Sequence, residues 1–415
     1  MKDGRFSVEE IARIFTAISL KNENPSMRII TRTIWILSMV SMFADISSEM
    51  LYPIIPVYLR QIGFTVFLIG LLEGLAEFTA GLSKGYFGQK SDETGKRLPF
   101  IKWGYFLSSL SKPMMAVITY PAWIFGARTI DRLGKGLRTA PRDAILSQEA
   151  TPETKARVFS FHRGWDTLGA VLGPSLALLF LQFHPAQYKS LFYLAFIPGI
   201  IATSCLFLLK EKKNIPGKTK KAGFFSFFNY WKTSTIEYKK LIVGLLIFAL
   251  FNSSDVFLLL RAKEITGNDT ITITAYIFYN LVYALSSFPA GIAADRIGLR
   301  KIFITGLLLF TIVYAGFAFL HLSMLVFILF FIYGIYAAAS EGIAKAWITN
   351  IAGSGQVATA VGFYTSCQSI CTLLASIIAG FLWSSFGVMT TFLATAVISF
   401  LVAVYFIFID GSIKK

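Results

Sequence analysis

The residues of this sequence that could do chemistry are charged side chains set among apolar ones. The densest group is the stretch DRLGKGLRTAPRDA, residues 131–144, with Arg128 just before it. Plotted as a helix at about 100° per residue, Arg128, Asp131, Arg132, Lys135, Arg138 and Arg142 fall within an arc of roughly 120° and form one stripe about 21 Å long. Such a stripe could bind the negative charge of a solute. The candidate residues are Arg128, Asp131, Arg132, Lys135 and Arg138.

Other charged residues lie at helical spacing inside apolar segments. The candidates are Asp45, Glu49, Glu73, Glu77, His162, Arg163, Asp166, Asp255, Glu341 and Lys345. An ionisable group inside a membrane is costly, so it usually faces a water-filled cavity or a partner. We predict a polar path whose acids take up and release protons. The alternative for any single residue is an ion pair that only joins helices, and Glu341 and Lys345, four residues apart, are expected to pair with each other.

Enzyme and cofactor chemistry find no support in the sequence. GKGLRT, residues 134–139, lacks the GxxxxGK[ST] order of a nucleotide-binding P-loop. No Ser/His/Asp or metal-ligand grouping is visible, because the histidines are scattered over different segments and the cysteines lie in apolar segments, which favours packing. We expect neither an enzyme nor a metal site, and no cofactor, with a proton gradient as the energy source.

The composition indicates a protein that crosses a membrane many times. Of its 415 residues, 55% are hydrophobic and 15% are charged, whereas soluble domains carry about 25% charged residues. Runs of about 20 apolar residues can span a bilayer. Such runs are predicted near 31–58, 66–88, 99–119, 158–182, 188–209, 239–260, 271–293, 301–320, 323–349, 357–383 and 388–409. The net charge of +16 comes from short tracts between these runs, and no separate basic domain exists to bind nucleic acid.

Two sequence repeats relate the halves of the chain and determine the place of the charged stretch. GQKSDETGKR (88–97) and GIAADRIGLRK (291–301) share Gly, Asp, Gly and basic residues, and SSEML (47–51) is echoed by SSDVF (253–257). Such self-similarity is typical of transporters built from two structural repeats. Both basic loops should face the cytoplasm, so an even number of crossings must separate them. Residues 121–146 must therefore form a further membrane helix despite their charges.

The distribution of Lys and Arg predicts the topology. Basic residues outside the spans gather before 34, in 88–97, at 155–157, in 210–240, at 296–301 and at the C-terminus, which assigns these segments to the cytoplasm. We expect an all-α membrane protein with twelve transmembrane helices in two pseudo-symmetric six-helix bundles, 31–209 and 239–410. An amphipathic N-terminal segment (1–30), a linker (210–238) and a tail (411–415) should be cytoplasmic. We expect a multi-pass monomer in the inner (plasma) membrane with both termini inside.

The two basic loops resemble the signature loops of the major facilitator superfamily, and the resemblance covers nearly the whole chain. It implies a cytoplasmic gate that is closed in the outward-facing state. The residues assigned to this gate are Asp92, Gly95, Lys96, Arg97, Asp295, Arg296 and Arg300. RTIDRLGKG (128–136) is similar to the family's arginine motif, which is tied to proton transfer. GAVLGP (169–174) resembles its antiporter motif, although Ala177 and Leu178 stand where glycines are usual.

The sequence therefore predicts a proton-coupled secondary transporter that moves a small anionic organic solute or chelator by alternating access. DRLGKGLRTAPRDA is similar to a bacterial subgroup of transporters and efflux permeases. The expected partners are the solute, protons and the lipid bilayer. A second possibility is efflux of drugs or hydrophobic compounds, with Asp45, Glu49, Glu73 and Glu77 binding cationic drugs. A third, from another class, is a membrane receptor without transport, against which the lack of a large soluble output domain argues.

Overall fold

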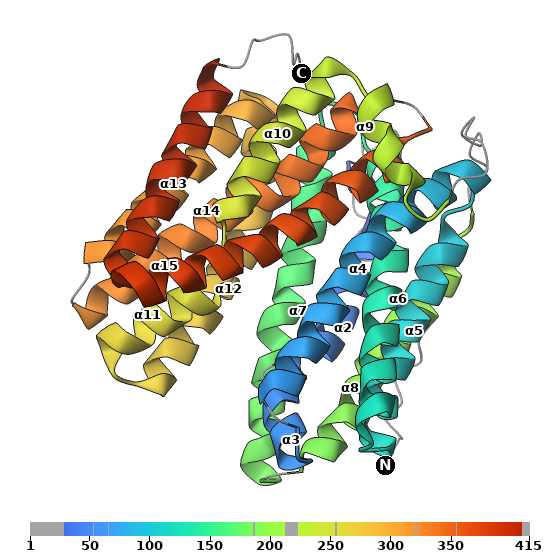
Figure 1. Ribbon diagram of the computed structural model, residues 1–415. Helices are drawn as coiled ribbons and strands as arrows, with labels where there is room; N and C mark the ends of the chain where they lie inside the picture. Colours follow the sequence, from blue (N-terminus) through green and yellow to red (C-terminus); the bar gives the residue numbers. More distant parts are fainter. Residues whose placement is uncertain are drawn as a thin grey trace, which may run out of the picture.

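A computed structural model describes residues 29–408 apart from 53, 65, 186, 212–222, 254, 320–321 and 354. All regular secondary structure in these residues is helical. The predicted amphipathic segment before residue 29, part of the predicted linker and the predicted tail lie outside the described residues. Figure 1 shows the helices arranged as two bundles joined at one end.

The first bundle contains the predicted extra helix. Its elements are α2 (Arg32–Glu49), α3 (Ile55–Gln61), α4 (Val66–Thr94), α5 (Leu98–Val117), α6 (Pro121–Gln148), α7 (Lys155–Phe183), α8 (Tyr188–Cys205) and the 3-10 turn η2 (Leu206–Leu208). Helix α6 begins at Pro121, where the missing N–H of proline costs nothing, and continues through Pro141 to Gln148. The charged stretch is therefore a helix rather than a loop, as predicted.

The second bundle follows a short linker of helical turns. The linker holds η3 (Ser226–Asn229) and α9 (Tyr230–Thr233), and the bundle holds α10 (Ile236–Phe251), α11 (Val256–Thr266), α12 (Asp269–Ile297), α13 (Leu299–Phe319), α14 (Ser323–Ile351) and α15 (Val357–Phe408). Gly387 interrupts α15 with φ +84°, a conformation that favours glycine. The element therefore makes two crossings, as the spans 357–383 and 388–409 predict.

Two predicted spans differ from the structure in the same way. The run 31–58 is broken between α2 and α3, and the run 239–260 is broken between α10 and α11. The breaks coincide with the repeated SSEML and SSDVF sequences. Ser, Asp and Asn side chains hydrogen-bond to nearby backbone and so weaken a helix interior. With each broken pair counted as one crossing, the described elements give the expected twelve.

Six of the described helices are long and apolar enough on their own to cross a membrane: α7, α8 with η2, α12 from Thr274, α13, α14 and α15. Helix α6 is not among them, because its many charged residues lower the hydropathy of the helix. Its place in the bundle depends instead on packing, since it contacts α4 and α5 extensively.

The two bundles meet mainly along two pairs of helices, α4 with α15 and α7 with α12. These contacts lie toward the end that carries α9, and the bundles diverge toward α3 and α11 (Figure 1). We call the joined end, which holds the loops around Asp92 and Asp295, the gate end. Glycines allow the close approach there: a Cβ added at Gly88 would lie 2.5 Å from the Ala358 oxygen, and one at Gly291 would lie 2.8 Å from the Ala156 oxygen.

Candidate functional site

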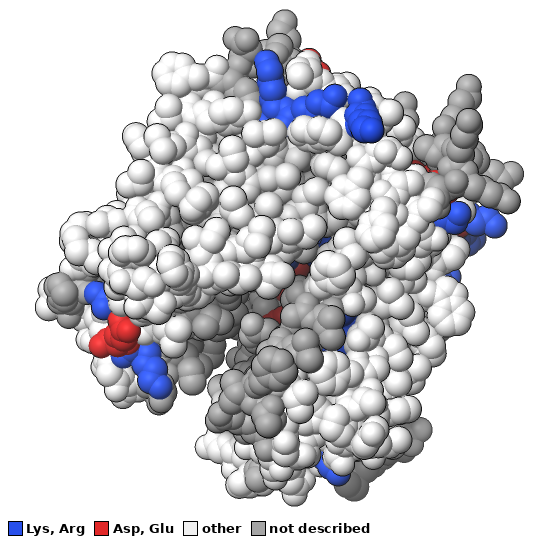
Figure 2. Space-filling view, viewed as in Figure 1, with Lys and Arg blue, Asp and Glu red and all other residues white. Residues whose placement is uncertain are grey.

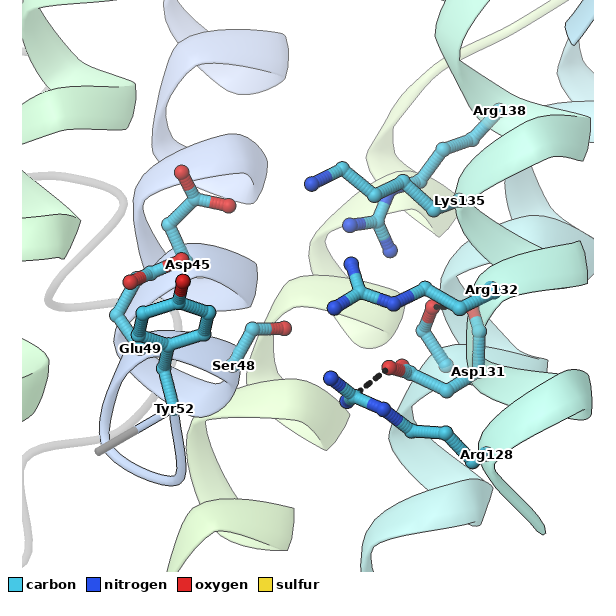
Figure 3. Close-up of a pocket in the computed structure, with 10 residues that line it drawn as sticks. Asp45, Ser48, Glu49, Tyr52, Arg128, Asp131, Arg132, Lys135 and Arg138 are labelled. Atoms are coloured by element: carbon cyan, nitrogen blue, oxygen red, sulfur yellow. Dashed lines mark hydrogen bonds and ion pairs between the residues drawn. The ribbon is translucent and has the colours of Figure 1, made fainter. Parts of the chain in front are cut away.

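The predicted cationic stripe faces the predicted acids of the first helix across a pocket. Figure 3 shows Asp45 and Glu49 of α2, with Tyr52 in the turn after it, on one side and Arg132, Lys135 and Arg138 of α6 on the other. About 400 Å³ of space between atoms, open solvent included, lies among these side chains. Its lining residues are Asp45, Ser48, Glu49, Tyr52, Ser108, Arg128, Asp131, Arg132, Lys135 and Arg138.

The stripe is buried at most of its positions. Arg128, Arg132 and Arg138 are each less than one-tenth exposed, while Lys135 is exposed. The charges of Lys135 and Arg138 act on Asp45, and those of Lys135 and Arg132 act on Glu49. The two walls are therefore electrostatically complementary, and a charged group that enters the pocket would meet both.

Asp131 is held inside the protein by two cations. Its carboxylate accepts a hydrogen bond from Lys112 Nζ of α5 at 2.8 Å and one from Arg128 Nη1 at 3.3 Å. Lys112 is 2% exposed. We did not predict Lys112 as a site residue, although a single lysine inside the apolar run 99–119 is the signal that could have found it. Asp131 thus serves as a counter-ion within the stripe.

The glycines of the stripe serve helix packing. A Cβ at Gly134 would lie 2.5 Å from the Gly104 oxygen of α5, and one at Gly136 would overlap Ser83 of α4. Close packing of α6 on two neighbours also places Arg138 over the Tyr105 ring, 4.1 Å from its centroid. These contacts support the interpretation of Gly134 and Gly136 as small residues at a helix interface.

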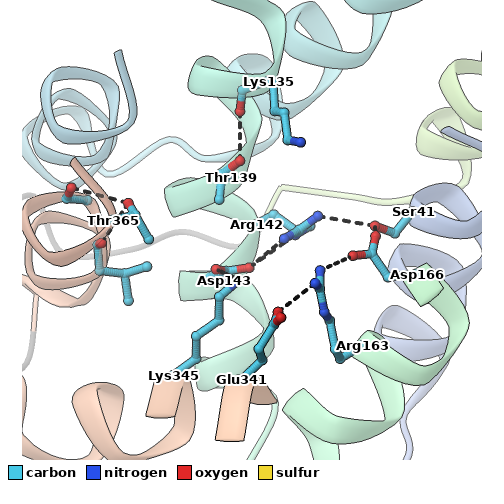
Figure 4. Close-up of polar contacts among 12 residues, drawn as sticks. Ser41, Lys135, Thr139, Arg142, Asp143, Arg163, Asp166, Glu341, Lys345 and Thr365 are labelled. Carbon is cyan, nitrogen blue, oxygen red and sulfur yellow. Dashed lines mark hydrogen bonds and ion pairs between the residues drawn. The ribbon is translucent and has the colours of Figure 1, made fainter. Parts of the chain in front are cut away.

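A second group of charges joins the two bundles farther along α6, between the pocket and the gate end; Figure 4 shows its contacts. Arg163 of α7 pairs with Glu341 of α14 at 2.5 Å, and Asp143 of α6 pairs with Lys345 of α14 at 2.9 Å. The predicted pair between Glu341 and Lys345 is therefore wrong. The two residues do lie on one face of α14, but each one reaches a partner in the first bundle, where a charge of opposite sign is available.

Each of these bridges has further hydrogen-bond partners, most of them in the first bundle and one, Tyr283, in α12 of the second. Arg163 donates to Asp166 at 2.6 Å and to the Tyr283 hydroxyl at 2.7 Å, and Ser41 donates to Asp166. Arg142 donates to Asp143 at 3.0 and 3.1 Å and to Ser41 at 3.1 Å. Asp143 and Ser41 were not predicted as site residues, and Arg142 was predicted only as the end of the stripe.

The remaining predicted path residues that the structure describes lie outside the pocket but within electrostatic reach of the second group of charges. His162 is buried, with its Nδ1 3.5 Å from the Ser38 hydroxyl. Asp255, at the break between α10 and α11, accepts a 2.7 Å hydrogen bond from the Tyr333 hydroxyl. The side chains of Glu73 and Glu77 lie outside the described part of the structure. Asp255 therefore belongs to the second bundle, whereas the stripe belongs to the first, and its neighbours include tyrosines.

Two of the predicted gate residues connect the bundles directly. Asp92 accepts hydrogen bonds from the Thr359 backbone N–H at 2.7 Å and hydroxyl at 2.9 Å, which joins α4 to α15. Asp295 accepts from the backbone N–H groups of Ala156 and Arg157, which joins α12 to the first turn of α7. Burial raises the pKa of Asp92, which lies beyond the apolar part of α4, to about 6.

The other gate residues have local roles. Arg97 donates to Asp92 at 3.3 Å, and Gly95 adopts φ +64° in the turn between α4 and α5. Arg300 donates to the Phe406 and Ile407 oxygens within the second bundle. Lys96 and Arg296 are exposed. The seven residues therefore lie at the gate end, but only the two aspartates contact the opposite bundle among the interactions described.

The molecule is closed at the gate end and open at the other. Figure 2 shows a hollow between the bundles with acidic and basic atoms at its base, while the surrounding face is largely uncharged. Arg163 and Glu341 have side chains that are 33% and 46% exposed, whereas the Asp143 side chain is fully buried. The bridge between Arg163 and Glu341 thus borders the open side. The bridge between Asp143 and Lys345 lies deeper in the protein, farther from solvent.

The lining of the pocket holds more cations than carboxylates. Its lining includes four cations, Arg128, Arg132, Lys135 and Arg138, and three carboxylates, Asp45, Glu49 and Asp131. Lys112 adds a further positive charge through its pair with Asp131. Among the described residues, no group of three or more His, Cys, Asp or Glu side chains is placed to hold a metal ion.

Comparisons with known proteins give consistent results. Residues 37–274 and 241–414 match the Major Facilitator Superfamily. An uncharacterized MFS-type transporter of Methanocaldococcus jannaschii is 34% identical over 399 residues, which are 94% of this chain and 98% of that protein. The multi-drug resistance efflux pump PmrA of Streptococcus pneumoniae is 28% identical over 183 residues, 43% of this chain and 44% of the pump.

Two solved structures have a similar fold. The human organic anion transporter MFSD10 aligns with a TM-score of 0.77 at 15% identity, over 92% of this chain and all of that one. The fucose:proton symporter FucP of E. coli also gives a TM-score of 0.77, at 12% identity, over 93% of this chain and all of that one. At these identities the likeness concerns the fold alone.

Proposed function

Since the chain belongs to the major facilitator superfamily, we propose that it carries a small anionic organic solute across the membrane by alternating access, driven by a proton gradient. The solute binds between α2 and α6, and the gate end faces the cytoplasm. The chain is a multi-pass membrane protein, and we place it in the inner (plasma) membrane with both termini in the cytoplasm, because basic residues concentrate in the loops at the gate end.

One observation carries the proposal for an anionic solute. Four cations of α6 line the pocket, and their charge exceeds that of the carboxylates around them. Burying cations without enough counter-charge is unfavourable, and a bound anion would supply that charge. An Arg side chain can also hold a carboxylate or phosphate by two parallel hydrogen bonds.

Proton coupling is supported by the acids that face the stripe. Asp45 and Glu49 of α2 share the pocket with Arg132 and Lys135. When an anion leaves the pocket, these carboxylates can take its place as partners of the cations; when an anion enters, they can take up protons. Binding of solute and binding of protons would then depend on each other.

Transport by purified protein in proteoliposomes tests both parts. We expect Arg132→Ala and Glu49→Gln to abolish uptake of organic acids without loss of membrane insertion, and Lys189→Ala, an exposed cation outside the pocket, to leave it unchanged. A panel of mono-, di- and tricarboxylates and sugar phosphates is first screened for thermal stabilisation, since binding to the folded state raises its melting temperature. Wild-type uptake by either pocket variant would refute that residue's role.

A pH gradient should drive the uptake. We expect transport to fall to the passive level when the gradient is collapsed with a protonophore. Uptake that persists without the gradient but needs sodium or a counter-solute would reject proton coupling while leaving the anion site intact.

Efflux of lipophilic compounds is a second candidate because of the names of two partial relatives. PmrA and the multidrug resistance protein MdtH of Photorhabdus laumondii are each 28% identical, over 43% and 32% of this chain. In that case Asp45 and Glu49 would bind a cationic drug. Resistance to several unrelated lipophilic cations on expression, with no organic acid transported or bound, would favour efflux over our proposal.

A further inference from the structure

A short aromatic segment crosses the seam between the bundles at the gate end. Residues 223–233, which contain the sequence FFSFFNYW, include η3 and α9 and precede α10. We call this segment the strap. It contacts α4 of the first bundle and α15 of the second, and these are the helices that Asp92 and Thr359 connect. The strap therefore bridges one of the two helix pairs that close the gate end.

The strap is anchored to the first bundle through Phe227 and Ser226. Phe227 is fully buried, and its ring lies so close to Gly85 of α4 that a Cβ added there would overlap it. Ser226 donates a 2.8 Å hydrogen bond from its hydroxyl to the side-chain oxygen of Gln89, one turn farther along α4. Gly85 thus supplies the space that receives the ring.

The strap is anchored to the second bundle through rings around Phe363 of α15. Trp231 stacks on Phe363 with their centroids 6.0 Å apart, and Phe228 meets it edge-on at 6.1 Å. Tyr230 packs against Tyr238 of α10 at 5.1 Å. The Tyr238 hydroxyl in turn donates a 2.8 Å hydrogen bond to the Ala360 oxygen. Because the strap also continues directly into α10, it belongs to the second bundle.

We propose that the strap is a latch for the gate: Phe227, carried by the second bundle, must leave Gly85 before α4 and α15 can separate. The buried ring stabilises the closed gate, because opening returns its apolar surface to water or lipid headgroups. This role depends on alternating access, which applies to any substrate, and it depends on neither the anion site nor proton coupling. The linker is then part of the gate as well as the connection between bundles.

The rate of thiol modification at a buried seam residue measures how often the gate opens. Ala358 lies at the seam beside Gly88 and is 0% exposed. In a background in which Cys205, Cys367 and Cys371 are replaced by Ala, an Ala358→Cys probe is modified by a water-soluble maleimide only when the seam separates. The rate then follows the fraction of open molecules, as exchange and proteolysis follow local opening.

We expect Phe227→Ala to raise this rate about ten- to hundredfold, the change that corresponds to burial of one Phe side chain at tenfold per 1.4 kcal/mol. Phe227→Leu should give a smaller increase. The matched control is Phe225→Ala, which removes a strap ring that is 60% exposed, and it should stay within about twofold of the parent. A rate for Phe227→Ala within twofold of the parent would overturn the proposal.

A second variant keeps the test decisive if Phe227→Ala does not fold. Gly85→Ala places a Cβ where the ring lies, so it should expel Phe227 and raise the modification rate on its own. Combined with Phe227→Ala, it should add little, because the ring is already gone. Independent, multiplicative effects of the two changes would show that the ring and Gly85 do not act together, and would reject the latch. The modification rates do not depend on the pocket, so the outcome of the transport assay with pocket variants does not change this test of the latch.

Discussion

The buried bridge between Asp143 and Lys345 should contribute much more stability than the exposed bridge between Arg163 and Glu341. The Asp143 side chain is fully buried, the Lys345 side chain is 23% exposed, and 2.9 Å separates the charged atoms. Removal of one partner of a buried ion pair typically costs about 3–5 kcal/mol, because the other charge stays behind without compensation. Arg142 remains bound to Asp143, so we expect Lys345→Met to lower the free energy of unfolding by about 3 kcal/mol.

A double-mutant cycle separates the pair from its surroundings. We expect Asp143→Asn alone to be destabilising and the double variant Asp143→Asn/Lys345→Met to recover about 2 kcal/mol relative to the sum of the two single changes. For Arg163 and Glu341, whose side chains are 33% and 46% exposed, solvent screens the charges. The corresponding coupling energy should be below about 1 kcal/mol.

The measurement is unfolding in mixed micelles of increasing SDS content, followed by tryptophan fluorescence. Both cycles are run in the same detergent and at the same pH, so that only the pair differs. A coupling energy within about 0.5 kcal/mol of zero for Asp143 and Lys345 would show that the two residues act independently. A larger coupling for the exposed pair would refute the argument from burial.

Two further predictions concern helix packing and pH. Gly134→Ala should lower the melting temperature, because its Cβ would lie 2.5 Å from the Gly104 oxygen and overpacking costs about 1–3 kcal/mol. The control is Gly126→Ala, where no atom lies within 4 Å of the new Cβ, and it should leave the melting temperature unchanged or raise it. Equal losses in the two variants would contradict the explanation by packing. The pKa of Asp92 is raised to about 6 by burial in the closed gate, so the closed state binds a proton more readily than an open state in which the carboxyl is hydrated. Closure should therefore become more favourable as pH falls from about 7 to 5, with a limit of about 1.4 kcal/mol per pH unit; the distance between spin labels on α4 and α13 would report it, and an equal response in Asp92→Asn would assign the effect elsewhere.

The number and order of the helices could be predicted because they depend on properties that the sequence shows directly. Apolar runs mark the spans, and the matching loops at Asp92 and Asp295 require an even number of crossings between them. An even number of crossings requires α6, which hydropathy alone would reject. Helical periodicity then placed Arg132, Lys135 and Arg138 on one face, and the structure finds all three in one pocket.

The breaks in the first and seventh crossings could not be predicted from hydropathy, because apolar residues continue on both sides of Glu49 and Asp255. The repeated Ser-Ser-acid sequence marks the place of each break. It was recognised as a repeat, but its local effect on the helix became visible only in the structure.

The partners of the charged residues were the least predictable feature. Sequence spacing reports neighbours on one helix, and so it suggested a pair between Glu341 and Lys345. The actual partners, Arg163 and Asp143, come from α7 and α6 of the other bundle, and their choice depends on how the bundles dock. Lys112 was overlooked for a related reason, since its partner Asp131 lies on the next helix.

The glycine-lined seam between α4 and α15 has a consequence for the entropy of gate closure. A Cβ at Gly88 would meet the Ala358 oxygen, and one at Gly362 would meet the Lys84 oxygen at 2.6 Å, so at these points the helices touch backbone to backbone. A glycine has no side-chain rotamers to lose when it becomes buried, whereas a long side chain can lose up to about 2 kcal/mol of conformational entropy. The seam can therefore open and close many times with little side-chain ordering in each cycle.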